Sequence, residues 1–189
     1  MMNVLIQSIE AEFRRYKALA EAALEQVGEQ RLSEPGPGGG NSLAILCWHI
    51  SGNLQSRFTE FLTSDGEKPW RQREEEFVAR EVTRGELLAK WHRGWDVLFA
   101  TMHSLSDADL PRTVVLRGRD LAVHEALHRA LAHVSYHVGQ IIYLARIYKS
   151  GEWRYLSIPP GQSDSYNANP AREKPHEHHD ALRRSSGPR

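Results

Sequence analysis

Four segments of the chain carry apolar residues at steps of three and four, the spacing that puts side chains on one face of an α-helix. These segments cover about residues 5–27, 41–63, 83–105 and 121–150. Asn41 or Ser42 can cap the second segment, and Thr83-Arg84-Gly85-Glu86 has the pattern of a capping box for the third. The stretch PRTVVLRGRDLA, before the fourth, predicts a small hairpin that turns at Gly118. Together these signals predict an all-α fold, a four-helix bundle with a small β-hairpin before the last helix.

Length and composition indicate a single soluble domain. The 189 residues suffice for one hydrophobic core, and 24 Lys plus Arg balance 24 Asp plus Glu, so the formal net charge is zero. That balance argues against nucleic acid or an anionic membrane as a partner. No apolar run approaches the ~20 residues of a membrane span, and the N-terminus lacks signal-peptide order, so a cytoplasmic protein is the default expectation. The single cysteine, Cys47, lies in an apolar run, which predicts a buried and unreactive thiol.

The two ends of the chain differ in composition. Residues 1–167 contain the helical segments and are expected to form the bundle. Residues 168–189 are rich in proline, serine, histidine and charge, and are expected to be a disordered tail whose HEHH tract binds metals adventitiously. The charge cluster RQREEE, residues 71–76, lies in the long connection between the second and third helices and is expected to be a solvated surface.

The stretch HEALHRALAHVSYHVGQ, residues 124–140, contains four histidines in two pairs. Each pair is spaced i, i+4, so one face of a helix can present it to a single metal ion. On a helical wheel, His133 and His137 lie closer on average to the centre of the apolar stripe than His124 and His128 do. Because metal sites in helical bundles are built from side chains that project inward, the wheel favours His133 and His137 as ligands.

The first pair belongs to the match His124-Glu125-Ala126-Leu127-His128, which fits the zinc-protease pattern H-E-x-x-H. The extended form of that pattern needs a glycine and a histidine where this chain has Leu131 and Val134. A zinc protease is therefore only a distant alternative.

Several stretches taken together resemble the DinB/YfiT-like superfamily of small bacterial four-helix proteins, which are classed as candidate metalloenzymes. The likeness is carried by LCWHISGNLQSRFTEFLTSDGEKPW at 46–70, LAHVSYHVGQIIYLAR at 131–146 and SIPPGQSDSYN at 157–167. The resemblance covers residues 4–167 and points to an uncharacterised branch of the superfamily. It implies an up-down-down-up order of the helices and a homodimer.

The resemblance also implies a metal site. In that superfamily one histidine of the second helix and two of the fourth hold a divalent ion, typically nickel or zinc, and the matching positions here are His49, His133 and His137. Some relatives transfer low-molecular-weight thiols or use a thiol cofactor. The His124–His128 match has no counterpart among the superfamily's metal motifs.

The expected function follows from this ligand set. His49 falls at the rim of the apolar stripe of its helix, which suits a cleft open to solvent. Three imidazoles leave a divalent ion with an open position for a thiolate or for water, so a transferase of small thiols and a hydrolase are both expected forms of the enzyme. Asn53 and Gln140 are candidates for contacts to the ligands or to a substrate, and no residue is assigned as catalytic. The alternative is a non-catalytic helical module for binding or oligomerisation.

Overall fold

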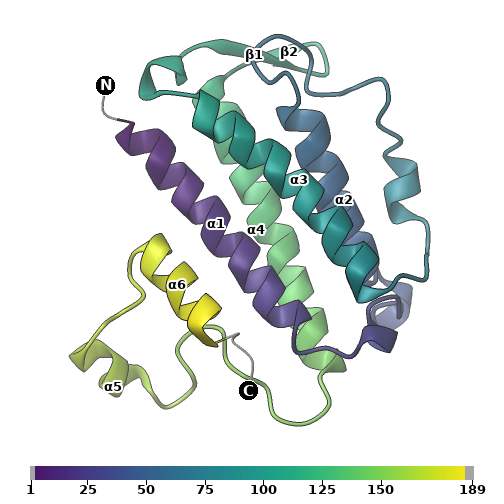
Figure 1. Ribbon diagram of the computed structural model, residues 1–189, viewed down its shortest axis with the longest axis vertical. Coiled ribbons are helices and arrows are strands. Elements are labelled where there is room, and N and C mark those ends of the chain that lie inside the picture. The colour runs from purple at the N-terminus through teal and green to yellow at the C-terminus, as the bar shows by residue number, and fades with distance from the viewer. Residues whose placement is uncertain (1–2, 186–189) are drawn as a thin grey trace.

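The computed structural model describes residues 3–185, which are mostly helical and include one small antiparallel hairpin. Within that range, no helix combines the length and the apolar character needed to cross a membrane. Figure 1 shows the long helices α1, Val4–Leu24; α2, Leu43–Phe58; α3, Arg84–Ser104; and α4, Val123–Tyr148. The other elements are the strands β1, Thr113–Leu116, and β2, Arg119–Ala122; the helices α5, Ser163–Ala168, and α6, Pro175–Ser185; and the 3-10 turns η1, Glu29–Arg31, η2, Pro37–Gly39, η3, Glu74–Phe77, and η4, Asp107–Asp109. The predictions of a mostly helical chain and of a hairpin before the last long helix are confirmed.

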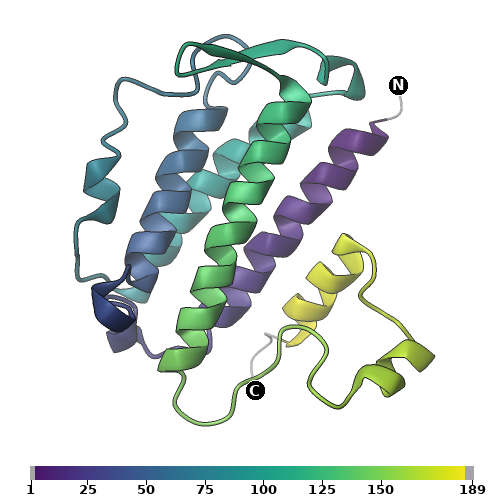
Figure 2. The same cartoon turned by 180° about the vertical axis from the view of Figure 1, so that it is seen from behind.

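The four long helices lie side by side, with α2 against α3 and α1 against α4 (Figures 1 and 2). Their apolar faces meet in one core, where Phe13 of α1 contacts Phe58 of α2 edge to face, with ring centroids 6.5 Å apart. Phe13 also meets Trp95 of α3 edge to face at 6.4 Å. Each of these fully buried aromatic side chains stabilises the fold by roughly 1.5–3 kcal/mol or more, so three helices are held at one point.

Local signals set the beginnings of two helices. The Ser42 side chain accepts a hydrogen bond from Ile45 N, so Ser42 caps α2, and Thr83 forms the predicted capping box with Glu86. The end of α2 differs from the prediction, because the helix stops at Phe58 rather than near residue 63. Glu60 has φ 49°, in the left-handed region that interrupts an α-helix and is unusual for a residue with a side chain.

The connection from α2 to α3 runs outside the helices and is tied to the hairpin at its start (Figure 1). Arg117 and Gly118 form the two-residue turn of the hairpin, both with positive φ, as the prediction of a turn at Gly118 requires. Asp65, in the connection, accepts hydrogen bonds from the backbone N–H groups of Arg117 and Gly118, each at 2.8 Å. The carboxylate of Asp65 therefore fixes the tip of the hairpin against the end of α2.

Close contact between α2 and α3 depends on a glycine. A Cβ atom added at Gly94 of α3 would lie 2.6 Å from the Cα atom of Ser51 in α2. The Ser51 hydroxyl also donates a hydrogen bond to the carbonyl of Lys90, one turn before Gly94. Any larger residue at position 94 would therefore push the two helices apart.

The C-terminal segment differs from the expectation of a disordered tail. Residues 175–185 form α6, which packs against α1 (Figure 2). His178 and Leu182, one turn apart on the same face, are buried, and His178 Nε2 lies 2.7 Å from the carbonyl oxygen of Leu156. A helix with only two buried side chains leaves a weak apolar pattern in the sequence, which explains why composition indicated a tail. Residues 186–189 of the expected tail lie outside the described residues.

Candidate metal centre

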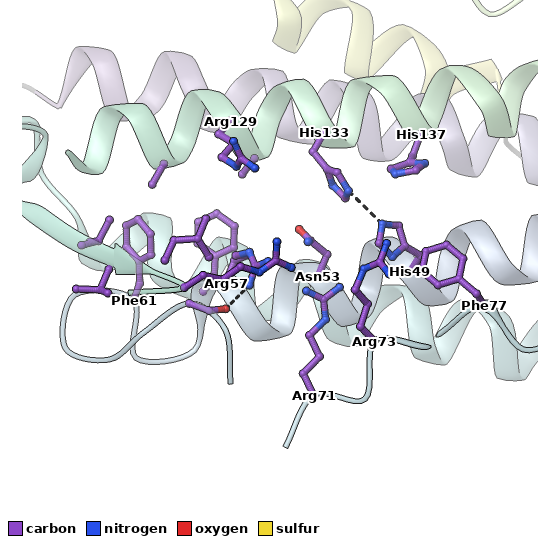
Figure 3. A pocket seen from close by; sticks show the side chains of 18 residues that line it. His49, Asn53, Arg57, Phe61, Arg71, Arg73, Phe77, Arg129, His133 and His137 are labelled. Carbon is purple, nitrogen blue, oxygen red and sulfur yellow. Dashed lines mark hydrogen bonds between the residues drawn. The ribbon is translucent and has the colours of Figure 1, made fainter. Parts of the chain in front are cut away.

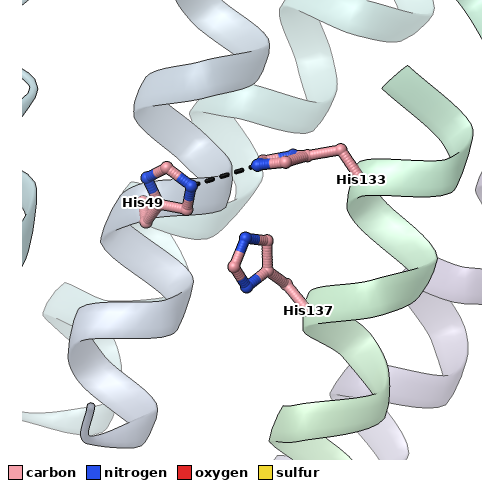
Figure 4. A group of neighbouring side chains, drawn as sticks. All are labelled: His49, His133 and His137. Atoms are coloured by element: carbon pink, nitrogen blue, oxygen red, sulfur yellow. Dashed lines mark hydrogen bonds between the residues drawn. The ribbon is translucent and has the colours of Figure 1, made fainter. Parts of the chain in front are cut away.

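Three histidines from two neighbouring helices meet at one point. His49 comes from α2, and His133 and His137 come from successive turns of α4, with their rings turned toward one another (Figure 4). One ring nitrogen from each lies within 4.8 Å of the others, and the ring centroids are 4.6 to 5.1 Å apart. The structure therefore brings together the three positions at which the sequence resemblance implied metal ligands.

The spacing of the nitrogens suits a small metal ion. His49 Nε2 and His133 Nε2 are 3.1 Å apart. Two nitrogens bonded to one ion at ~2.1 Å, with tetrahedral or octahedral angles, lie roughly 3.0–3.4 Å from each other. The pair could therefore hold an ion with little movement of either helix.

Two of the three rings are oriented by a second polar group. His49 Nδ1 donates to Glu76 Oε2 at 2.9 Å, and His137 Nδ1 donates to Gln140 Oε1 at 2.7 Å. When these rings are neutral, the arrangement leaves Nε2 of each as a lone pair facing the centre. Metal-binding histidines are usually held in this way, with the outer N–H donated to a carboxylate or carbonyl oxygen. Gln140 therefore contacts one of the candidate ligands, His137. His133 Nδ1, by contrast, is buried without a hydrogen-bond partner in the described part of the chain.

Glu76 shows that the expectation of a solvated RQREEE cluster was wrong for part of it. Glu76 and the side chain of Arg71 are almost fully buried. Arg71 donates two hydrogen bonds to the carboxylate, from Nε to Oε1 at 2.8 Å and from Nη2 to Oε2 at 2.9 Å. Burial raises the pKa of Glu76, but hydrogen bonds from His49 and Arg71 and the charge of Arg71 outweigh it, so the pKa lies below its ordinary value. The carboxylate is therefore ionised beside His49 at neutral pH.

A glycine of α2 makes room for this carboxylate. A Cβ atom added at Gly52, one turn after His49, would lie 2.1 Å from Glu76 Oε1. Sequence reasoning missed Gly52, Arg71 and Glu76. One signal was present, because a glycine inside a helix with strong apolar patterning often marks the close approach of another group.

Burial keeps two of the imidazoles, those of His133 and His137, neutral. Desolvation, followed by the charges of His137 and His49, lowers the pKa of His133 from 6.5 to about 3. Desolvation also lowers the pKa of His137, against the hydrogen bond to Gln140 that raises it. Because only neutral imidazole binds a metal, these two side chains are ready to act as ligands at neutral pH.

A cavity of about 560 Å³ opens beside the three histidines (Figure 3). Asn53, one turn after His49, lies in its wall. The remaining wall combines five arginines with apolar residues of α2, α4 and the hairpin. The histidines therefore lie in the wall of an accessible cavity, in agreement with the position of His49 at the rim of its apolar stripe.

The H-E-x-x-H match has a structural role in this fold. Glu125 Oε2 accepts a hydrogen bond from Ala122 N at 2.7 Å and so caps the first turn of α4. His124 Nδ1 lies 3.0 Å from the carbonyl oxygen of Leu110, and both His124 and His128 are exposed. His124 and Glu125 are thus engaged at the start of the helix, and neither they nor His128 line the cavity, so the match does not support the zinc-protease alternative.

Comparison with known proteins assigns a family without an activity. The family model described as "Protein of unknown function (DUF1572)" matches residues 2–162, a range that contains α1 to α4, the hairpin and all three histidines. No curated protein and no solved structure matches the chain.

Proposed function

We propose that this chain, which belongs to the DUF1572 family, binds one divalent metal ion through His49, His133 and His137 and uses it to act on a small molecule. The observation that carries the proposal is the convergence of three imidazoles at the wall of a cavity. Glu76 and Gln140 support it, because they turn Nε2 of His49 and His137 toward the common centre.

The number of ligands favours a reactive site over a structural one. Structural zinc sites use four protein ligands, whereas three leave a position at which a divalent ion supplies Lewis acidity and lowers the pKa of a thiol or of water. The same donor set serves the transfer of a low-molecular-weight thiol and hydrolysis. Imidazole ligands suit nickel and zinc.

We also propose that the family shares the DinB/YfiT-like bundle with its up-down-down-up order of helices. The connection between α2 and α3 supports this order, because it runs back along the outside of α2 (Figure 1). α3 then begins near the end of the molecule at which α2 begins.

The homodimer implied by the resemblance remains a proposal. Tyr136, Tyr143 and Ile147 of α4 are exposed and recur at helical spacing, which supports a partner on this face. Light scattering coupled to size-exclusion chromatography would test it. A dimer that Tyr143→Glu dissociates supports the proposal, and a monomeric wild-type protein contradicts it.

The metal content of the purified full-length chain tests the proposed function directly. His176→Gln and His179→Gln would be present in every sample, because a histidine tract near the C-terminus, here with His176 exposed and His179 half-buried, can bind nickel and zinc on its own. His178 would be kept, since it is the buried histidine of α6. After reconstitution with zinc or nickel and desalting, elemental analysis should find about one ion per chain.

Variants identify the ligands. His133→Ala and His137→Ala should lose the ion while keeping the helical circular dichroism of the parent. His128→Ala is the matched control, because His128 is an exposed histidine of the same helix, and it should retain the metal. A metal-free parent protein, or equal metal in His133→Ala and His128→Ala, would overturn the proposal.

A further inference from the structure

The cavity beside the histidines is lined by positive charge. Arginines reach it from α2, from the α2–α3 connection, from the hairpin and from α4 (Figure 3). Among residues 3–185, no aspartate or glutamate lines it. The five arginines are Arg57, Arg71, Arg73, Arg117 and Arg129.

Three of these arginines already have internal partners. Arg71 is held by Glu76, while Arg57 and Arg117 share Glu67, at 3.1 and 2.8 Å. Two carboxylates thus oppose three guanidinium groups, and the shared pair leaves positive charge in the wall.

The other two arginines are available to a ligand. Arg129 makes no ion pair or hydrogen bond with another side chain among residues 3–185. Arg73 pairs with Glu74, whose side chain is 86% exposed, and its guanidinium carbon lies 4.9 Å from the centre of the Phe77 ring. Surface contacts of these two kinds are each worth only about 0–1 kcal/mol. Both guanidinium groups could therefore turn to an anion at little cost.

The order of histidines, arginines and apolar residues along the cavity indicates which parts an anionic ligand would have. Arg129 precedes His133 by four residues on α4, which places it about one helical turn, ~6 Å, from the metal ligands. The lining also includes apolar side chains, with Phe61 at the end of the cavity away from the histidines in Figure 3 and Val114 and Ala126 among the others.

We propose that the cavity binds a small organic anion, a carboxylate or phosphate with an apolar portion, whose oxyanion is held by Arg129 and Arg73. The apolar portion lies toward Phe61, and the reacting group reaches the three histidines. The inference rests on the proposed function, since the metal is the reactive end of the cavity. To the proposed function the inference adds the class of substrate, a small organic anion.

Charge explains why an anion is required. Five guanidinium groups are matched by only three carboxylates, Glu67, Glu74 and Glu76. A divalent ion would add to this excess of positive charge, in a partly desolvated space where charges interact more strongly than in water. Guanidinium groups bind carboxylate and phosphate through paired hydrogen bonds, and hydrogen bonds to charged groups contribute about 1.5–3 kcal/mol. A ligand with an oxyanion gains that energy, and its uncharged analogue does not.

Calorimetric titration with matched probes tests the proposal. 4-Phenylbutyrate and 2-phenylethyl phosphate are the anionic probes, and 4-phenylbutanamide is the uncharged analogue. The metal-loaded full-length protein should bind at least one anionic probe about ten-fold more tightly than the amide. The comparison of the two anionic probes assigns the ligand as carboxylate or phosphate.

Arginine variants connect the preference to the cavity. Arg129→Gln should reduce the ratio of the affinity for the anionic probe to the affinity for the amide several-fold. The double variant Arg73→Gln/Arg129→Gln should bring this ratio near one, and the metal content should be unchanged in both variants. Arg119→Gln, an exposed arginine of β2 outside the cavity, should leave the ratio unchanged.

The outcomes separate this inference from the proposed function. Protein that holds its metal but shows no preference for either anionic probe, or keeps the preference in the double variant, overturns the inference alone. Absence of binding by both anionic probes at millimolar concentration also overturns it. Protein that prefers the anionic probes through Arg129 but takes up no metal overturns the proposed function and leaves the anion site standing.

Discussion

Glu76 accepts a hydrogen bond from Nδ1 of His49 at 2.9 Å, although 27 residues separate them along the chain. The bond joins the α2–α3 connection to the middle of α2, and Arg71 holds the same carboxylate from the other side. The α2–α3 connection is therefore part of the candidate site, because its carboxylate fixes which nitrogen of His49 faces the centre.

Glu76→Gln should weaken metal binding about 10–100-fold, because a neutral amide holds the N–H of His49 less strongly than a carboxylate does. Competition with a chromophoric chelator would measure the affinity. Glu75→Gln, at the exposed neighbouring position, is the control and should bind metal like the parent. Equal affinities of the two variants would show that Glu76 does not support the site.

Gly52→Ala should also weaken metal binding, because the new methyl group would displace the Glu76 carboxylate from His49. Gly139→Ala offers a helical glycine with open space around it, and should gain about 0.5–1 kcal/mol of stability without loss of affinity. Urea unfolding of both variants would measure the effect of alanine on helix stability. Chelator competition would measure the loss of metal affinity caused by movement of the Glu76 carboxylate. A Gly52→Ala protein with unchanged affinity would contradict the proposed role of the glycine.

Gly94→Ala should destabilise the fold by roughly 1–3 kcal/mol, since the methyl group would meet the backbone of α2 rather than a movable side chain. Gly85→Ala, in the first turn of the same helix, has no such contact and serves as the control. The measurement is the free energy of unfolding in urea. Equal free energies of unfolding for the two variants would contradict the claim that the close approach of α2 and α3 requires glycine at position 94.

Asp65→Asn should destabilise the protein at neutral pH and lose its effect in acid. Backbone hydrogen bonds from Glu67, Gly118 and Arg117 lower the pKa of this carboxyl from 3.8 to about 2. A depressed pKa means that the ionised carboxylate stabilises the fold above pH ~4, and that this stabilisation is lost as the pH falls toward 2. The difference in melting temperature between the parent and the variant should therefore shrink from pH 6 to pH 3.

Asp120→Asn, exposed on β2, controls for the loss of one negative charge from the hairpin. The contradictory result would be a difference between the parent and Asp65→Asn that stays constant with pH.

Local sequence determined the elements and one half of the site. The steps of three and four predicted the long helices, the capping box at Thr83 set the start of α3, and Gly118 marked the hairpin turn. The i, i+4 spacing already placed His133 and His137 together, because residues four apart on a helix share a face whatever surrounds them. The wheel could rank this pair above His124 and His128 for the same reason.

Only the tertiary structure decided how the remaining parts meet. His49 and His133 are 84 residues apart in the sequence. Whether they meet depends on how α2 packs against α4, and no local pattern specifies that packing. Arg71 and Glu76 are charged residues in a connection, and a charged side chain is buried only when a distant partner compensates it, which neighbouring sequence cannot reveal. α6 likewise depends on the face of α1 that receives His178 and Leu182. The sequence alone therefore determined what depends on near neighbours, whereas the contacts that turn the histidines toward one centre arose from the long-range packing of the chain.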